Sequence, residues 1–139
     1  MTSRLDKCRL IQLPRIQDAR GNLTAIEGTD VTGFEIRRVY YLYDVPGGAD
    51  RGAHAHKALW QLVIAIMGSF DITLDDGERK RTFQLNRGYQ GLLICPYIWR
   101  ELNNFSSGAV CLVLASERYD PTDYIRDYDA FLAAAKAQG

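Results

Sequence analysis

The chain has 139 residues, in which 17 Lys and Arg balance 17 Asp and Glu, 47% are hydrophobic and 24% are charged. The hydrophobic share argues against intrinsic disorder, and the balanced charge argues against nucleic-acid binding, which needs surplus Lys and Arg to neutralise phosphates. No apolar run approaches the ~20 residues that span a bilayer, and the polar start lacks a signal-peptide core, so we expect neither a membrane nor a nucleic-acid partner.

Short strand-like segments follow one another along most of the chain. Residues 34–43 are rich in the aromatic and β-branched residues that suit a pleated surface. Later segments of the same kind cover residues 59–67, 70–74, 79–85, 91–96, 99–105 and 109–116. Between two of them, the run Asp75-Asp76-Gly77 has the chemistry of a tight hairpin turn, so we expect both acids to serve the turn. This spacing predicts an antiparallel sandwich or barrel.

The C-terminal segment is the part of the chain with a helical pattern. Residues 120–123 (Asp-Pro-Thr-Asp) have the side chains typical of a helix start, and Pro121 suits a first helical turn. Residues 130–137 are mostly strong helix formers. We therefore expect an all-β fold, a single barrel with a short C-terminal helix, as one domain over residues 1–139.

Three cysteines, Cys8, Cys95 and Cys111, cannot all pair within one chain, and their spacing matches no zinc motif. Cys95 and Cys111 lie in apolar strand-like runs. We expect buried thiols that pack as small hydrophobic groups, and a cytoplasmic location, where thiols stay reduced.

The two histidines of the chain, His54 and His56, lie two residues apart after a glycine-rich loop. On a strand this spacing directs both imidazoles to one face. The alternative is a pair of surface or core histidines without a chemical role. An imidazole with a pKa near 6.5 both accepts and returns protons near neutral pH, which suits proton abstraction next to a carbonyl. The pair therefore favours keto–enol isomerisation or epimerisation, with Arg51, Arg100 and tyrosine hydroxyls as candidates to stabilise an enediolate.

The histidine pair also resembles the first motif of the cupins, through the spacing of Gly48, His54, His56, Gln61 and Gly68. Metal-binding cupins carry Glu where this chain has Gln61. In the degenerate second motif, Arg100 occupies the position of the usual third histidine ligand. Two imidazoles and an amide supply too few ligands, and a guanidinium repels a divalent cation. We therefore predict a metal-free pocket and no cofactor.

The wider sequence resembles the sugar-nucleotide 3,4-ketoisomerases, cupins that act on dTDP-4-keto-6-deoxyglucose. The matching segments are residues 18–27, 37–44, 51–57, 74–77, 96–101 and 114–128. The resemblance implies a cupin double-stranded β-helix (jelly-roll) barrel and a shift of the carbonyl from C4 to C3 of a dTDP-linked keto-deoxysugar. It also implies a homodimer with shared strands, working in deoxysugar biosynthesis for lipopolysaccharide O-antigen or S-layer glycans.

The same resemblance assigns roles to the two histidines. His56 would remove the proton from C3 and help deliver one to C4, and His54 would move a proton between the two oxygens. Arg51 is a candidate for the pyrophosphate, because a guanidinium suits phosphate oxygens. Tyr40 or Trp99 would stack on the thymine or the sugar.

Glu101 has two candidate roles: it would hold an imidazole in the productive tautomer, or it would pair with Arg100. The rings of Tyr40, Tyr41 and Tyr43 alternate between faces, so at least one of them belongs to the core or a dimer interface.

Arg20 and Arg100 bear on the configuration at C4. Among relatives, Arg at position 20 accompanies galacto products, and Arg at position 100 accompanies gluco products. Without a third histidine, an acid on the opposite face is harder to supply, because guanidinium is a poor proton donor. This argument favours 3-keto-6-deoxyglucose. The alternative for Arg20 is a turn residue or an ion-pair partner of Asp18.

Three other functions remain open at this point. A dTDP-sugar 3,5-epimerase would use one histidine with a tyrosine as the opposite acid, and would exchange C5. A non-catalytic nucleotide-sugar-binding or regulatory cupin would bind without turnover. A metal-dependent dioxygenase is disfavoured by Gln61 and Arg100.

Overall fold

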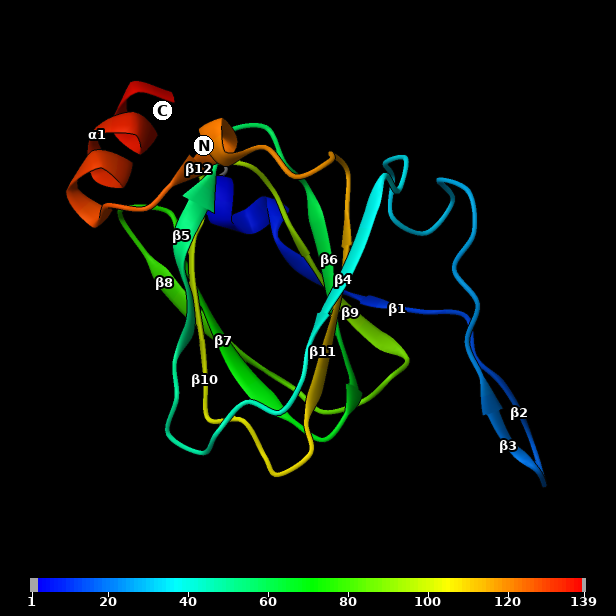
Figure 1. Cartoon of the computed structure of the whole chain (residues 1–139). Coiled ribbons are helices and arrows are strands. Elements are labelled where there is room, and N and C mark those ends of the chain that lie inside the picture. The colour runs from blue at the N-terminus through cyan, green and yellow to red at the C-terminus, as the bar shows by residue number, and fades with distance from the viewer. Residues whose placement is uncertain (1–2, 139) are drawn as a thin grey trace.

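Ten strands in the computed structural model, which describes residues 3–138, form two five-stranded antiparallel sheets that face each other (Figure 1). In spatial order, the first sheet contains β1 (Arg9–Gln12), β9 (Gln90–Ile94), β6 (Gln61–Met67), β11 (Val110–Ala115) and β4 (Arg38–Leu42). The second contains β12 (Tyr124–Ile125), β5 (Arg51–His56), β10 (Trp99–Asn103), β7 (Phe70–Asp75) and β8 (Lys80–Leu85). The expected antiparallel β-barrel is confirmed.

The main core lies between the two sheets and takes side chains from both. Alternate residues of β7 bury Phe70, Ile72 and Leu74, as the two-residue period of a strand predicts. Val63 of β6 and Leu102 of β10 belong to the same buried cluster. This packing fixes the strands that carry the site.

A short hairpin of β2 (Ile16–Asp18) and β3 (Gly21–Leu23) projects away from the barrel (Figure 1). All six of its strand residues are exposed. The hairpin is preceded by β1 and by a short 3₁₀ helix, η1 (Arg4–Lys7).

The C-terminal region differs from the expectation. Residues 120–123 do not open the α-helix: Asp120 caps a separate 3₁₀ helix, η2 (Pro121–Asp123), by accepting the N–H of Thr122 at 3.0 Å. The chain then forms β12, because Tyr124 and Ile125 pair with β5. Helix α1 (Tyr128–Gln138) begins after Asp127, whose carboxylate accepts the N–H of Ala130 at 2.9 Å. Within residues 3–138, no helix is both long and apolar enough to cross a membrane.

The turn after β7 uses both of its acids as the sequence predicts. Asp75 accepts the N–H of Gly77 at 2.7 Å, and Asp76 accepts those of Glu78 and Arg79 at 2.9 and 2.8 Å.

The cysteines also follow the expectation. Cys8, Cys95 and Cys111 are free thiols, and all three are buried.

Candidate active site

A bulge in β5 places the two histidines. Arg100 of β10 pairs with His54, whereas the next residue, Glu101, pairs with Gly52, so Ala53 is an extra residue on β5. Ala53 has a φ of 58° and Gly52 a φ of 87°. At Gly52 a Cβ would also lie 3.0 Å from the carbonyl oxygen of Arg100, so glycine suits the position.

The imidazoles of His54 and His56 lie beside each other, as the spacing predicts. Their ring centroids are 4.8 Å apart and the rings are nearly perpendicular, at 87°. The ring of Tyr124 packs against both, with centroids 5.0 Å from His54 and 4.4 Å from His56. The rings of His54 and Tyr124 thus form one wall of the site, with the His56 ring packed behind them.

A cavity of about 790 Å³ adjoins this wall. His54 lines it, whereas His56 lies behind the wall and is 1% exposed. The polar and aromatic residues that line the cavity are Arg38, Tyr40, Asp50, Arg51, His54, Gln61, Arg100, Glu101, Asn103, Tyr119, Tyr124 and Arg126. Four arginines against two carboxylates make the cavity suited to an anionic ligand.

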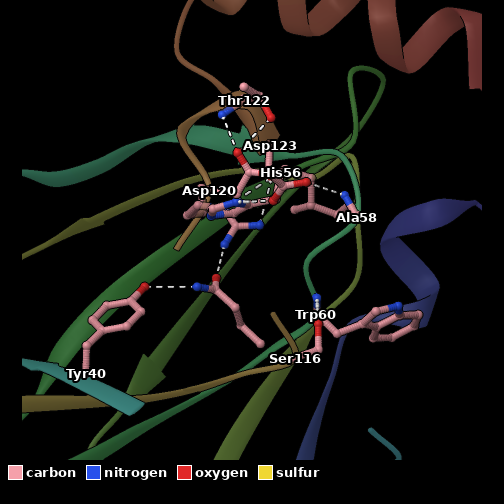
Figure 2. A network of polar contacts seen from close by, with 11 residues as sticks. Tyr40, His56, Ala58, Trp60, Ser116, Asp120, Thr122 and Asp123 are labelled. Atoms are coloured by element: carbon pink, nitrogen blue, oxygen red, sulfur yellow. Dashed lines mark hydrogen bonds and ion pairs between the residues drawn. The ribbon is translucent and has the colours of Figure 1, made fainter. Parts of the chain in front are cut away.

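His56 is held by a carboxylate from η2 (Figure 2). Its Nδ1 lies 2.9 Å from Oδ2 of Asp123, and Oδ1 of Asp123 accepts the N–H of Ala58 at 2.7 Å. A carboxylate only accepts, so Nδ1 carries the proton and Nε2 holds the lone pair. Nε2 is buried and has no hydrogen-bond partner among the described residues.

His54 has the same tautomer for a similar reason. Its Nδ1 lies 3.1 Å from the carbonyl oxygen of Gly52, which is an acceptor, so Nδ1 donates. Nε2 of His54 is then the basic nitrogen. Both imidazoles therefore present Nε2 as a proton acceptor.

Burial keeps both imidazoles neutral. It lowers the pKa of His54 to about 4, and the Arg100 cation adds to this effect. It lowers the pKa of His56 to about 2, with further contributions from Arg100 and His54. The expectation of a pKa near 6.5 is wrong for the resting protein, because the barrel wall excludes water from both rings. Each ring is therefore a neutral base near pH 7.

A buried chain of polar groups runs from Arg100 to Tyr40. The Nε and Nη2 atoms of Arg100 donate to the carbonyl oxygen of Ile98 at 3.2 and 3.1 Å, and Nη1 donates to Oε1 of Gln61. The amide of Gln61 then donates to the Tyr40 hydroxyl at 2.9 Å (Figure 2). Burial raises the pKa of Tyr40, so its hydroxyl stays protonated. The chain ends in a fixed cation beside the histidines.

This polar chain occupies the positions where a cupin would hold a metal. The Gln61 oxygen is bound to a guanidinium, which leaves the two imidazoles as the remaining candidate donors. Residues 3–138 contain no group of three or more His, Cys, Asp or Glu placed to hold an ion. The donor set at Gln61 and Arg100 is therefore unsuited to a divalent cation.

Some of the site residues predicted from the sequence line the cavity, and others lie elsewhere in the structure. Tyr40, Arg51, His54, Arg100 and Glu101 line the cavity. Of the two residues predicted to stack on the ligand, Tyr40 lines this cavity and Trp99 does not. It lies on the opposite side of β10 from Arg100, where it packs against Tyr128 and Phe131 of α1, with ring centroids at 5.3 and 5.8 Å.

Two other predicted contacts are absent from the described residues. Arg20 lies at the tip of the hairpin, 90% exposed, with Nη2 at 2.8 Å from Oδ2 of Asp18, so the ion-pair interpretation is confirmed. It does not line the cavity of its own chain. Neither contact predicted for Glu101 forms, because Asp123 holds the imidazole of His56 and Gln61 binds Arg100.

The sequence interpretation missed Asp123, Tyr124, Arg38 and Arg126. Asp123 lies in residues 120–123, which were interpreted as a helix start, and Tyr124 follows directly after them. Arg38 lies over the Tyr40 ring at 5.1 Å, and its Nε is buried without a partner in the described part of the chain. Arg126 lies 4.3 Å over the Tyr124 ring. Each arginine lies two residues from an aromatic residue in sequence, a pattern too common to mark a site.

Two antiparallel sheets around a cavity with paired histidines on one wall define a cupin-type barrel. The model of the FdtA family, described as "WxcM-like, C-terminal", matches residues 6–136, and the chain belongs to this family.

Relatives with assigned activities are similar over most of their length. The TDP-4-oxo-6-deoxy-α-D-glucose-3,4-oxoisomerase of Aneurinibacillus thermoaerophilus is 45% identical over 123 residues, which is 88% of each chain. The QdtA 3,4-ketoisomerase of Thermoanaerobacterium thermosaccharolyticum, solved with TDP, has a TM-score of 0.92 and 44% identity, covering 94% of this chain and 96% of its own. The WlaRB TDP-quinovose 3,4-ketoisomerase of Campylobacter jejuni has a TM-score of 0.87 and 49% identity, covering 91% and 97%. The predicted family and the isomerase class are confirmed.

Proposed function

We propose that this protein is a 3,4-ketoisomerase that converts TDP-4-keto-6-deoxyglucose to the TDP-3-keto-6-deoxy sugar without a metal or cofactor. The observation that carries the proposal is the pair of neutral, Nδ1-protonated imidazoles beside a cavity that four arginines line. Relatives named for this activity support the substrate.

The reaction moves two protons and needs no external oxidant. Nε2 of His56 takes the proton from C3, and the electron pair forms a C3–C4 double bond while the C4 carbonyl oxygen becomes an oxyanion. His54 carries a proton from the C3 hydroxyl to the C4 oxygen. The proton on His56 exchanges with solvent, and His56 then protonates C4 as the C3 carbonyl forms. C3 is oxidised and C4 is reduced within one molecule.

Arg100 stabilises the enediolate. Its guanidinium is 3% exposed and is held in place by Ile98 and Gln61, so it stabilises negative charge without having to reorganise. The same negative charge raises the proton affinity of the two imidazoles. The low pKa of the free imidazoles and the rise in their proton affinity next to the enediolate therefore offset each other, so that the proton affinities of imidazole and substrate carbon become similar.

His56 reaches the sugar only if Tyr124 shifts. The Tyr124 ring lies against both imidazoles, and His56 does not line the cavity in the unliganded protein. Strand β12, which carries Tyr124, is two residues long and pairs with β5 alone. Such a short strand opens at little cost, and substrate binding would move the ring aside.

The diphosphate would bind to the arginines on the other walls. Arg38, Arg51 and Arg126 line the cavity, and Nε of Arg38 has no partner in residues 3–138. A guanidinium suits phosphate oxygens, because it offers parallel N–H donors. Substituting Arg38 with Met would raise KM more than it lowers kcat.

The product would have the gluco configuration. Arg100 is a fixed cation that gives up a proton poorly, so the same histidine that removes the C3 proton serves C4. The relative named for TDP-quinovose, a 6-deoxyglucose, supports this assignment. A large H4–H5 coupling in the product would support it, and Arg100→His would introduce galacto product.

A homodimer would complete the assembly. Val39, Tyr41 and Tyr43 are exposed on and next to the edge strand β4, an apolar surface of the kind that subunit interfaces cover. Arg20 lies outside the cavity of its own chain, so it would act on a site only from a second copy. Light scattering of the wild-type protein would give twice the mass of one chain. The Tyr41→Glu variant would give a mass closer to that of a single chain.

The experiment that tests the function monitors TDP-4-keto-6-deoxyglucose by NMR in deuterated water. The proposal predicts a 3-keto product with deuterium at C4, deuterium entering at C3 of the remaining 4-keto substrate, and none at C5. Exchange at C5 would instead support a 3,5-epimerase, and TDP binding without any exchange would support a non-catalytic cupin. A His56→Asn variant, with its fold checked by circular dichroism, should show no exchange.

A further inference from the structure

Cys8 and Cys95 form a buried pair outside the catalytic cavity. Cys8 follows η1 and Cys95 follows β9, and their Sγ atoms are 3.7 Å apart. The two residues are 2% and 1% exposed. A disulfide has an S–S distance of about 2.05 Å, so a shift of less than about 2 Å would join them.

The two thiols differ in acidity. The hydrogen bond with Cys95 lowers the pKa of Cys8, and the Arg100 cation contributes in the same direction. The same pairing, together with burial, raises the pKa of Cys95. In Cys111, burial alone raises the pKa to about 12. Cys8 is therefore the most nucleophilic of the three sulfurs, and Cys95 lies in place to resolve an oxidised Cys8.

The segment that begins with Cys95 also holds two groups of the active site. Two residues after Cys95, the N–H of Tyr97 donates to the carbonyl oxygen of His56 at 2.7 Å. One residue further, the carbonyl oxygen of Ile98 accepts both Nε and Nη2 of Arg100. A displacement of Cys95 would therefore move a backbone partner of His56 and the acceptor that orients Arg100.

We propose that Cys8 and Cys95 are a redox modification site, in which a hydroperoxide oxidises the pair to a reversible disulfide that lowers turnover. Cys8 sulfur attacks the peroxide, which gives a sulfenic acid and releases water. The Cys95 sulfur then displaces the hydroxyl, which leaves as a second water, and the S–S bond forms. Two thiols lose two electrons in total, and one peroxide gains them.

The oxidant reaches the pair through the N-terminal segment. A four-residue 3₁₀ helix covers Cys8, and Arg4 ties it to the barrel through hydrogen bonds of 3.3 Å to Tyr97 and 3.0 Å to Ala135. Short terminal elements of this kind open more easily than the core. A peroxide is small enough to enter, whereas a bulky disulfide reagent would react more slowly.

The test treats the full-length protein with hydrogen peroxide and then alkylates the remaining thiols in denaturant. The proposal predicts one alkylated thiol, at Cys111, and a non-reduced peptide that joins Cys8 to Cys95. The disulfide closes a long loop, so the midpoint of thermal unfolding should rise by about 5 °C or more. Three alkylated thiols, or a different pairing, would overturn the proposal.

The measurement of turnover rests on the proposed function, whereas the peptide mapping does not. A failure of the disulfide proposal can therefore be distinguished from a failure of the proposed function. Turnover should fall at least about fivefold on oxidation and return with dithiothreitol, because small displacements of catalytic groups are costly. Cys8→Ser should keep wild-type turnover and lose the response, and Cys111→Ala should keep the response. Unchanged turnover in the disulfide form, or a loss that dithiothreitol does not reverse, would refute the switch.

Discussion

The Asp123 carboxylate determines both the orientation and the tautomer of His56. It is itself held by the N–H of Ala58, and its carbonyl oxygen accepts the N–H of Lys57 at 3.0 Å. Because Nδ1 of His56 must donate to it, Nε2 is left free to accept the substrate proton. Asp123 thus acts on the reaction through His56, as a positioning residue.

Replacing Asp123 with Asn should lower kcat by about 100-fold or more while the fold persists. An amide nitrogen facing Nδ1 would favour the other tautomer, in which Nε2 carries the proton and cannot act as a base. Steady-state kinetics would measure the loss, and KM should change much less than kcat.

Asp127→Asn is a matched control for this variant. Asp127 caps α1 through the N–H of Ala130, and asparagine is also a good cap, so its turnover should equal that of the wild type. If Asp123→Asn turns over as fast as Asp127→Asn, Asp123 has no positioning role.

For single residues, the sequence predicts contacts between groups that are close along the chain. The juxtaposition of His54 and His56 follows from their spacing on one strand. Asp123 lies 67 residues from His56 and no local pattern connects them, so its role could not be predicted. The position of Trp99 outside the cavity could not be predicted, because the face of β10 that lines the cavity depends on the register with β5 and its bulge, which composition does not reveal.

The C-terminal helix is held by an aromatic cluster and by hydrogen bonds that include one from Arg4 to Ala135 and one from Tyr128 to Asp75. The Tyr128 hydroxyl donates to Oδ2 of Asp75 at 2.6 Å, and Phe131 packs on Trp99 and Ala55. The bond to the carboxylate raises the pKa of Tyr128 to about 12, so the hydroxyl is a donor at neutral pH.

Tyr128→Phe should lower the free energy of unfolding by about 1–2 kcal/mol, because the ring packing stays and the buried Asp75 loses one donor. Urea denaturation followed by circular dichroism would measure this. Tyr119→Phe is the matched control for stability, since Tyr119 is exposed, and it should be neutral. Equal stabilities for the two variants would contradict this account of how α1 docks.

The strands from β6 to β11 could be predicted because each is a short segment bounded by turn residues, mainly apolar in β6, β9 and β11 and alternating in β8 and β10. The 3₁₀ helix and β12 could not, because Asp-Pro-Thr-Asp suits the first turn of either helix type. The next two residues form a strand because they pair with β5, a contact that spans about half of the chain. The β2–β3 hairpin was missed because its exposed residues carry no buried face to create a pattern.

The burial of both histidines links the fold to pH. Their pKa values lie below 6.5 in the folded protein, at about 4 for His54 and about 2 for His56, so the unfolded chain binds protons that the folded chain does not. Stability is therefore fully present above pH 6.5 and is lost as the pH falls from 6.5 toward 4. Each histidine contributes up to about 1.4 kcal/mol per pH unit in this range.

Urea unfolding at pH 7.5, 6, 5 and 4.5 would show this decline. A His54→Asn/His56→Asn double variant should show a flatter profile over the same range, because it lacks the two groups that take up protons on unfolding. Parallel profiles for the two proteins would mean that the histidines are solvated in the folded state.

At the scale of the whole molecule, the packed barrel brings the paired imidazoles together with the residues that enclose them. The family resemblance predicted the barrel, and the cupin motif predicted where the imidazoles lie. Their low pKa depends on the enclosure that Arg100, Tyr124 and the barrel wall create together. That enclosure is a property of the packed fold, which is why the expectation of near-neutral titration was wrong.

Proton transfer by the two imidazoles, without a bound cation, is most directly measured by turnover of protein stripped of metal. Elemental analysis would verify the stripping, and TDP-4-keto-6-deoxyglucose carrying deuterium at C3 would report the bond that breaks. We expect full turnover with loss of deuterium from C3 to water, and no loss with His56→Asn. Turnover that disappears on stripping and returns with a divalent cation would contradict the account.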